Sequence, residues 1–144
     1  MSKSERRDHP GDPWRLFQYD QTHILTILGS YKLPLRFQVG LRFRYASGNP
    51  FTPVAHAYYD VNSYVYVPLY GTPYSARMPD FHQLDLRVDK SFLFNRWKLL
   101  VYLDIENLYN AASVEGITYT FDYRRPRYLN GLPFLPVLGA RGEF

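Results

Sequence analysis

Polar and apolar residues alternate with a period of two along several stretches of the chain. The clearest stretch is 36–47, in which the even positions are charged, polar or small. Its odd positions are apolar: Phe37, Val39, Leu41, Phe43 and Tyr45. A period of two is typical of a β-strand whose two faces meet different surroundings. The eleven steps between successive residues of this stretch, at about 3.3 Å each, span roughly 36 Å, or roughly 27 Å along the membrane normal at a tilt of about 40°. That length matches a bilayer hydrocarbon core of about 25–30 Å.

Four further stretches are predicted to be strands. Residues 81–92 and 97–109 alternate in the same way, and the short link between them predicts a hairpin. Residues 21–33 and 137–144 alternate less regularly. The short turns at Pro34 and Asn95-Arg96 alternate with two long connections, 48–79 and 110–136, as in outer-membrane barrels. The pattern therefore predicts an all-β fold of about five antiparallel transmembrane β-strands in residues 21–144. Residues 1–20 are predicted to be an N-terminal loop or a truncated extracellular segment.

Aromatic residues fall at both ends of the predicted strands. The chain holds 14 Tyr, 10 Phe and 2 Trp, which together are 18% of its residues. Those near the short turns are Tyr31, Phe92, Phe94, Trp97 and Phe144; those near the long loops are Tyr45, Phe51, Phe81 and Tyr109. Two aromatic girdles are typical of membrane barrels. A soluble antiparallel sheet with one wet face and one core face explains the alternation equally well, so it stays open as an alternative.

Composition and motifs exclude several classes of protein. The chain has no cysteine, which removes disulfide scaffolds, Cys-zinc sites and thiol catalysis. It has no run of about 18 apolar residues, so no transmembrane helix is expected. The net charge of +4 is scattered along the chain, and we expect no nucleic-acid partner. The four histidines lack metal-ligand spacing, and no nucleotide-binding or nucleophile motif occurs. We therefore expect no catalytic residue, metal or cofactor: the protein is not an enzyme.

The polar face of the predicted strands carries balanced charge. Its residues, expected to face the lumen of a barrel, are Arg36, Gln38, Arg42, Arg44, Gln83, Asp85, Arg87, Asp89, Asp104 and Glu106. A hairpin turn at Asn95-Arg96 puts Arg87 opposite Asp104, which is favourable. The same register puts Asp85 opposite Glu106, a like-charge pair that an arginine of the preceding strand could relieve. A solvated charged face is the alternative interpretation.

The long connection 48–79 is the best candidate for a ligand-binding surface. It contains six tyrosines: Tyr58, Tyr59, Tyr64, Tyr66, Tyr70 and Tyr74. Tyrosine offers rigid, amphipathic contact area at a low entropy cost. Alternatively, these rings pack the loop on itself or extend the outer girdle. In the soluble alternative, the protein is a small β-sheet binding module that uses this loop as its contact surface.

Five segments carry a family resemblance in their order and spacing. They are YDQTHILTILGSYKLP (19–34), LRFRYASGNPFTPV (41–54), MPDFHQLDLRVDKSF (78–92), WKLLVYLDIENLYN (97–110) and LPFLPVLGARGEF (132–144). Together they resemble the C-terminal end of a TonB-dependent outer-membrane receptor. The resemblance implies the C-terminal part of a large, 22-stranded β-barrel around a plugged lumen. It also implies energised uptake of a ferric chelate, cobalamin or sugar. The terminal Phe144 resembles the aromatic residue recognised during barrel assembly, although Ala140 and Gly142 are smaller than that pattern expects.

The resemblance also implies a location and partners. The location is the outer membrane, and the partners are its lipid, the remaining barrel strands, a plug domain and the TonB system. The stretch MSKSERRDHPGDPWR is not followed by the apolar segment of a secretory signal. Known barrels have at least about eight strands, so five cannot close one. We therefore expect a fragment of a longer receptor that does not transport alone, and that contacts TonB through a missing N-terminal part. A barrel assembled from several copies of the chain is the less favoured alternative.

Overall fold

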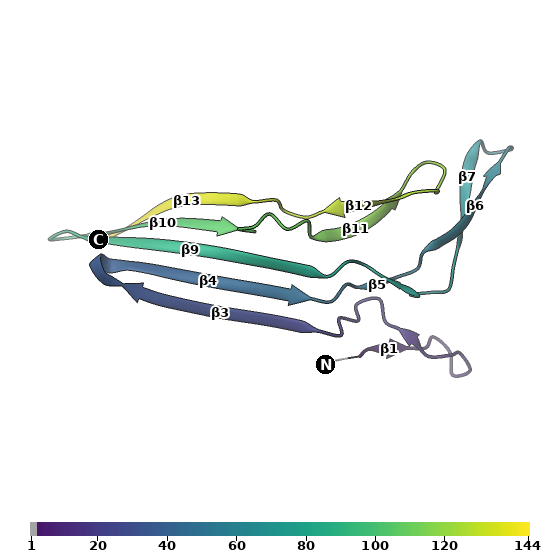
Figure 1. The fold of residues 1–144 in the computed structure, drawn as a ribbon, viewed down its shortest axis with the longest axis horizontal. Helices are drawn as coiled ribbons and strands as arrows, with labels where there is room; N and C mark the ends of the chain where they lie inside the picture. Colours follow the sequence, from purple (N-terminus) through teal and green to yellow (C-terminus); the bar gives the residue numbers. More distant parts are fainter. Residues whose placement is uncertain (1–2) are drawn as a thin grey trace. The chain divides into compact units, whose positions relative to one another are not determined.

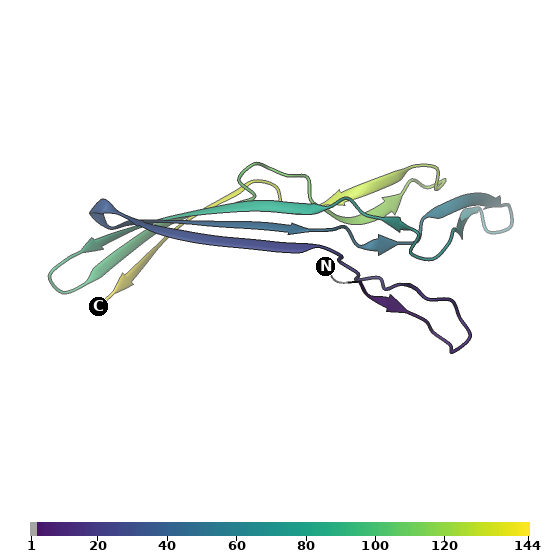
Figure 2. The same cartoon turned by 60° about the horizontal axis from the view of Figure 1, so that its bottom comes forward.

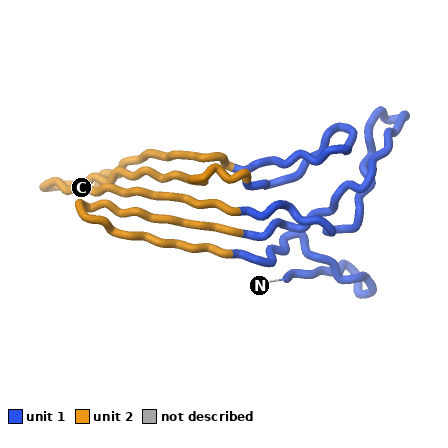
Figure 3. Tube along the Cα trace, viewed as in Figure 1, with its two compact units in different colours: residues 1–24, 46–81, 113–131 blue, residues 25–45, 82–112, 132–144 orange. Residues whose placement is uncertain are grey.

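The chain is all-β, as the alternation predicts. A computed structural model describes residues 3–144, and their regular structure is strand apart from one short 3-10 turn, Pro34–Arg36 (Figure 1). No helix in this part of the chain is long and apolar enough to cross a membrane. Two compact units form (Figure 3). Unit 2 comprises residues 25–45, 82–112 and 132–144, and unit 1 comprises 46–81, 113–131 and the segment that ends at Ile24.

Unit 2 is built on a five-stranded sheet with the order β13-β10-β9-β4-β3. Its strands are β3 (Ile24–Leu33), β4 (Phe37–Ala46), β9 (Phe81–Leu93), β10 (Lys98–Glu106) and β13 (Leu135–Glu143). β10 pairs antiparallel with both β9 and β13. The view in Figure 2 shows these strands rotated relative to one another, which is the usual twist of a sheet. β3 and β13 are its edges, so this sheet is open.

The predicted register of the hairpin between β9 and β10 is confirmed. Arg87 lies opposite Asp104, and Leu99 lies opposite Phe92. A short turn leaves little freedom for the pairing of the two strands to shift, and a shift of one residue would move every side chain of a strand to the other face of the sheet. The prediction of strands and faces is therefore correct for this hairpin.

Several strand ends differ from the predicted ones. Arg36 lies in the turn after β3 rather than in β4, because Leu35 and Arg36 adopt the left-handed conformation with φ of 60° and 63°. β10 stops at Glu106 rather than at residue 109, because Asn107 has a φ of 54°. β13 begins at Leu135, two residues before the predicted start, and ends before Phe144.

The two long connections, 48–79 and 110–136, are not wholly irregular, because each contains paired strands. In unit 1, β5 (Pro50–Phe51) pairs with β8 (Ala76–Arg77), and β6 (Val54–Asp60) pairs with β7 (Val65–Tyr70). β11 (Val114–Tyr119) pairs with β12 (Pro126–Asn130). A two-stranded ribbon tolerates proline because each strand has one side free of ladder hydrogen bonds. The segment 1–20 also contains a short ribbon, β1 (Glu5–Arg6) with β2 (Arg15–Leu16).

Candidate functional site

The sheet of unit 2 has one apolar face. Cross-strand neighbours on it include Leu103 opposite both Val88 and Leu138, and Ile105 opposite Leu86. The apolar face is formed by the odd positions of β4 and β10 and the even positions of β9: Phe37, Val39, Leu41, Phe43, Tyr45, Leu84, Leu86, Val88, Phe92, Leu99, Val101, Leu103 and Ile105. Leu138 of β13 is 75% exposed.

Apart from Pro50, no apolar side chain in the described part of the chain is buried, whereas six polar or charged residues are. The buried residues are Asp20, Ser47, Gln83, Asp85, Asn107 and Ser113. This is the reverse of the usual distribution in a soluble domain, where Val, Ile, Leu and Phe are most often buried and unpaired charges almost never are. The described chain therefore has polar clusters where a soluble protein has a core.

Asp85 is the centre of the polar face. It is 5% exposed, and its carboxylate accepts hydrogen bonds from Arg42 Nε (2.8 Å), Gln83 Nε2 (2.6 Å) and the Asn107 backbone N–H (3.1 Å). Arg44 Nη2 lies 3.5 Å from the same carboxylate. The sequence left open whether an arginine of the preceding strand reaches Asp85, and in the structure both Arg42 and Arg44 contact its carboxylate. Two guanidinium groups and two N–H donors offset the cost of burying this carboxylate.

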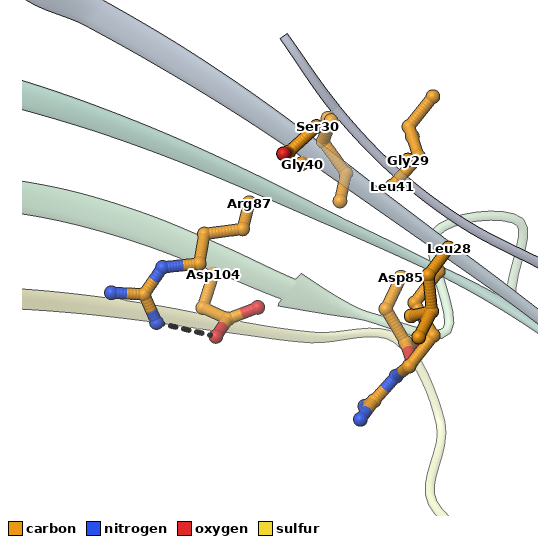
Figure 4. Close-up of a pocket in the computed structure, with 10 residues that line it drawn as sticks. Leu28, Gly29, Ser30, Gly40, Leu41, Asp85, Arg87 and Asp104 are labelled. Atoms are coloured by element: carbon orange, nitrogen blue, oxygen red, sulfur yellow. Dashed lines mark hydrogen bonds and ion pairs between the residues drawn. The ribbon is translucent and has the colours of Figure 1, made fainter. Parts of the chain in front are cut away.

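A second cluster surrounds Arg87, drawn in Figure 4 with its ion pair to Asp104. The guanidinium lies 3.3 Å from the Asp104 carboxylate and 3.0 Å from that of Asp89. It also lies 4.5 Å from the centroid of the Tyr102 ring, a cation–π contact. Tyr102 is directly opposite Gly139, and a Cβ on that glycine would come within 2.3 Å of the Tyr102 ring. A Cβ at position 139 would therefore displace the Tyr102 ring from its place across β13.

The predicted polar residues that lie in the strands share one face of the sheet, whereas Arg36 lies in the turn before β4. A hollow of about 390 Å³ is lined by Arg42, Asp85, Arg87 and Asp104, together with small or apolar residues such as those labelled in Figure 4. A second hollow of about 650 Å³ includes three more of the predicted residues, Arg36, Gln38 and Asp89. Glu106 ends β10 opposite Leu135. The assignment of this face to the lumen of a barrel stays a prediction.

The six predicted tyrosines do not form one surface. Tyr59 lies opposite Tyr66, with ring centroids 5.1 Å apart, and Tyr66 also packs edge-on against Phe121 at 5.6 Å. Tyr70 alternates onto the same side of β7 as Tyr66. Tyr58 lies opposite Val67 on the other side of the β6–β7 ribbon.

The other two tyrosines lie outside this ribbon. Tyr64 lies in the turn between β6 and β7. The guanidinium of Arg15 lies over the Tyr74 ring, 5.5 Å from its centroid. A groove of about 420 Å³ beside Tyr66 is lined by Tyr119, Phe121 and Tyr123, which sequence reasoning did not single out. The contact with Phe121 accords with the alternative that these rings pack the connections on themselves, and ligand binding stays a prediction.

Sequence reasoning also missed a buried carboxylate in unit 1. Asp20 is 1% exposed and accepts hydrogen bonds from the Ser4 backbone N–H (2.6 Å), Arg77 Nη2 (2.5 Å) and Thr22 Oγ1 (3.2 Å). The Ser4 N–H and then the Arg77 guanidinium hold the pKa of Asp20 below its ordinary value of 3.8. Arg77 also donates to the carbonyl of Gly48 at 3.0 Å. This cluster joins the N-terminal segment to β8, and no local motif signals a contact between residues 57 positions apart.

Asn107 is another buried polar residue that the alternation could not identify. It is 1% exposed and connects the end of β10 to Ala111 and Leu132. Its only sequence signal is that asparagine tolerates the left-handed conformation after a strand.

Scans against models of protein families, and searches of curated proteins and of solved structures, found no match to this chain. The resemblance to TonB-dependent receptors therefore stays a prediction from the sequence.

Proposed function

We propose that this chain forms the last five strands of an outer-membrane β-barrel of the TonB-dependent receptor class. In this proposal, the complete receptor takes up a ferric chelate, cobalamin or sugar by energised transport, and this chain supplies part of its wall. The observation that carries the membrane assignment is the apolar face of the unit 2 sheet, whose side chains are exposed or half-buried, in a chain whose buried side chains are mostly polar.

Lipid is the surrounding that best fits this face. In water, an exposed apolar patch of more than a few hundred Å² is rare and marks an interaction surface or a membrane contact. Four of the sheet's strands contain 9 or 10 residues and β9 contains 13, against a usual strand length of about 5–6. A tilted transmembrane strand needs about 9–11 residues. The length of the strands and the apolar face of the sheet therefore both favour a lipid bilayer as the surroundings.

The two open edges support a larger barrel. β3 and β13 each have a pairing partner on one side only. A bilayer offers no hydrogen-bond partner to backbone groups, so the free edges need further strands. Single-chain bacterial barrels have at least about eight strands. The plug, the TonB contact and the transported ligand rest on the sequence resemblance alone.

A soluble binding module is the weaker alternative. Such a module would bury one face of its sheet, and none of the apolar side chains on the unit 2 sheet is buried. The tyrosines of 48–79 do not favour it either, because they lie on different sides of a ribbon.

A matched pair of substitutions tests the membrane assignment. Leu103→Arg puts a charge on the apolar face, and Leu100→Arg puts the same charge on the polar face of the same strand. The protein is diluted from urea into phosphatidylcholine vesicles and floated on a density gradient after a carbonate wash. A charge at the midplane costs a membrane strand about 2–4 kcal/mol, so Leu103→Arg should lower flotation by about 30-fold or more. Leu100→Arg should float like the parent. A parent that stays monodisperse without detergent and does not float would contradict the assignment.

The receptor assignment is tested at the gene. Genomic DNA upstream of the Met1 codon should encode, in frame, a plug and further strands. A stop codon directly upstream would contradict the simple fragment interpretation. Accumulation of labelled ferric chelates, cobalamin and sugars in a strain deleted for the gene tests uptake. Loss of one ligand, restored by the intact gene, supports the proposal, and unchanged accumulation of all three classes argues against it.

A further inference from the structure

Lys90 is an unusual residue on the apolar face. It alternates with Val88 and Phe92 along β9 and lies opposite Val101 of β10. The other positions of this face on β4, β9 and β10, as defined above, carry no charged side chain. A charge among lipid-facing residues is costly near the bilayer centre but is tolerated near the interface, where a long side chain reaches the headgroups. Lys90 is three residues from the end of β9, or about 10 Å along the strand.

The surroundings hold the Lys90 ammonium at the end of the sheet. It donates a hydrogen bond to the carbonyl of Leu35, in the turn between β3 and β4. It lies 4.0 Å from the centroid of the Phe37 ring and 5.6 Å from that of Phe92. An ammonium has three donors, so two remain for another acceptor.

Arg36 supplies a second cation to the same place. Lys90 and Arg36 both line a hollow of about 540 Å³ whose walls include Phe92 and Phe94. The left-handed φ of 63° at Arg36 belongs to the turn that also positions the Leu35 carbonyl. Within residues 3–144, the side chain of Arg36 has no hydrogen-bond or ion-pair partner, although it also borders the polar-face hollow that contains Asp89.

An aromatic cluster marks the depth of this hollow. The ring of Phe94 stacks on that of Trp97 with centroids 4.4 Å apart, and Trp97 stacks on Phe144 at 6.0 Å. Both contacts lie at the turn between β9 and β10, close to the C-terminus (Figure 1). Aromatic rings of this kind lie at the level of lipid headgroups.

We propose that Arg36 and Lys90 bind the phosphate of an anionic phospholipid headgroup at the short-turn end of the sheet. This inference rests on the membrane position proposed above. A guanidinium presents paired donors that fit phosphate oxygens, and the ammonium adds a point charge. Phe92 and Phe94 border the site with apolar surface that suits the beginning of the acyl chains. Each cation near an anionic membrane surface contributes about a fivefold preference.

Trp97 provides a local probe. The chain has two tryptophans, so Trp14→Phe leaves Trp97 alone to report. The protein is inserted into phosphatidylcholine vesicles that contain equal mole fractions of either brominated phosphatidylglycerol or brominated phosphatidylcholine. We expect the brominated phosphatidylglycerol to quench Trp97 more strongly. Lys90→Gln and Arg36→Gln should each lower that preference by about fivefold. Lys32→Gln is the matched control, because it removes one positive charge near the same end but on the polar face.

The outcomes separate this inference from the proposed function. If neither brominated lipid quenches Trp97, the membrane position fails and the lipid site fails with it. If both lipids quench the parent equally, the membrane position holds and the lipid site is wrong. An equal loss in Lys32→Gln would show attraction by net charge alone and would also overturn the site. Inorganic phosphate is added to vesicles of phosphatidylcholine as a further arm. A change in Trp97 emission that Lys90→Gln abolishes would assign the site to free phosphate instead.

Discussion

Asn107 offers a sharp test of how β10 ends. Its side chain makes three hydrogen bonds across the end of the sheet. Nδ2 donates to the carbonyls of Ala111 and Leu132 at 2.9 Å each, and Oδ1 accepts from the Ala111 N–H at 2.7 Å. The residue is 1% exposed and has a φ of 54°. We therefore compare Asn107→Ala with Asn107→Gly, which lose the same hydrogen bonds but differ in backbone freedom.

The expected magnitudes follow from these contacts. Three hydrogen bonds at about 1 kcal/mol each give a loss of about 3 kcal/mol for Asn107→Gly. Alanine adds about 1 kcal/mol, because a Cβ disfavours the left-handed conformation. Asn107→Ala should therefore lower the free energy of unfolding by about 4 kcal/mol. Glycine is normally the more harmful of the two residues in a regular element, so the reversed order is diagnostic.

Urea unfolding in detergent micelles, followed by tryptophan fluorescence, measures the loss. Hydrogen exchange at the Ala111 amide, a partner of Asn107, shows whether the loss is local. Asn110→Ala is the control, because Asn110 also has a left-handed φ, 52°, but its side chain accepts one hydrogen bond, from Phe134 N–H. It should cost about 2 kcal/mol. Equal losses for the alanine and glycine variants of Asn107, or losses below about 1 kcal/mol for both, would refute this account.

Three further predictions concern the two units. Gly139→Val should detach β13, seen as faster trypsin cleavage after Arg141, and adding Tyr102→Ala should restore protection because it removes the clashing ring. The pKa of Asp20 is lower in the folded protein than its unfolded-state value of about 3.9. The ionised carboxylate therefore stabilises the fold at pH values above about 3.9, and this stability is lost as the pH falls through the lower folded pKa. Acid unfolding curves of Asp20→Asn should lack this pH-dependent loss of stability. Asp85→Ala should lower the free energy of unfolding by about 3 kcal/mol, because it leaves the partner arginines without their buried carboxylate; a loss under about 1 kcal/mol in urea unfolding would contradict the role of this ion pair.

Much of the β9–β10 hairpin could be predicted from the sequence. Successive side chains of a strand point to opposite faces, so local alternation alone assigns Arg87 to one face and Val88 to the other. The short turn then fixes the register that pairs Arg87 with Asp104. The same alternation assigned Arg42 and Asp85 to polar faces, but the long connection 48–79 between their strands left their contact open.

Regular pairing inside the long connections could not be predicted in the same way. Prolines such as Pro68 read as loop signals, yet Pro68 lies in β7 opposite Ala57. A central strand would not accept this proline, whereas a strand of a two-stranded ribbon does. Whether the proline lies in a central strand or in a two-stranded ribbon depends on which segments pair with its strand, and the local pattern does not show this.

The sequence by itself determined the strand segments, the chemistry of their faces and the register across the short hairpin. Only the tertiary structure decided that Asp20 meets Arg77, that Asn107 joins Ala111 to Leu132, and that Tyr102 lies over Gly139. Face and period follow from the geometry of neighbouring residues, which every short segment contains. Contacts between distant segments depend on how the connecting chain closes and on which buried polar groups find partners, and both are properties of the whole fold.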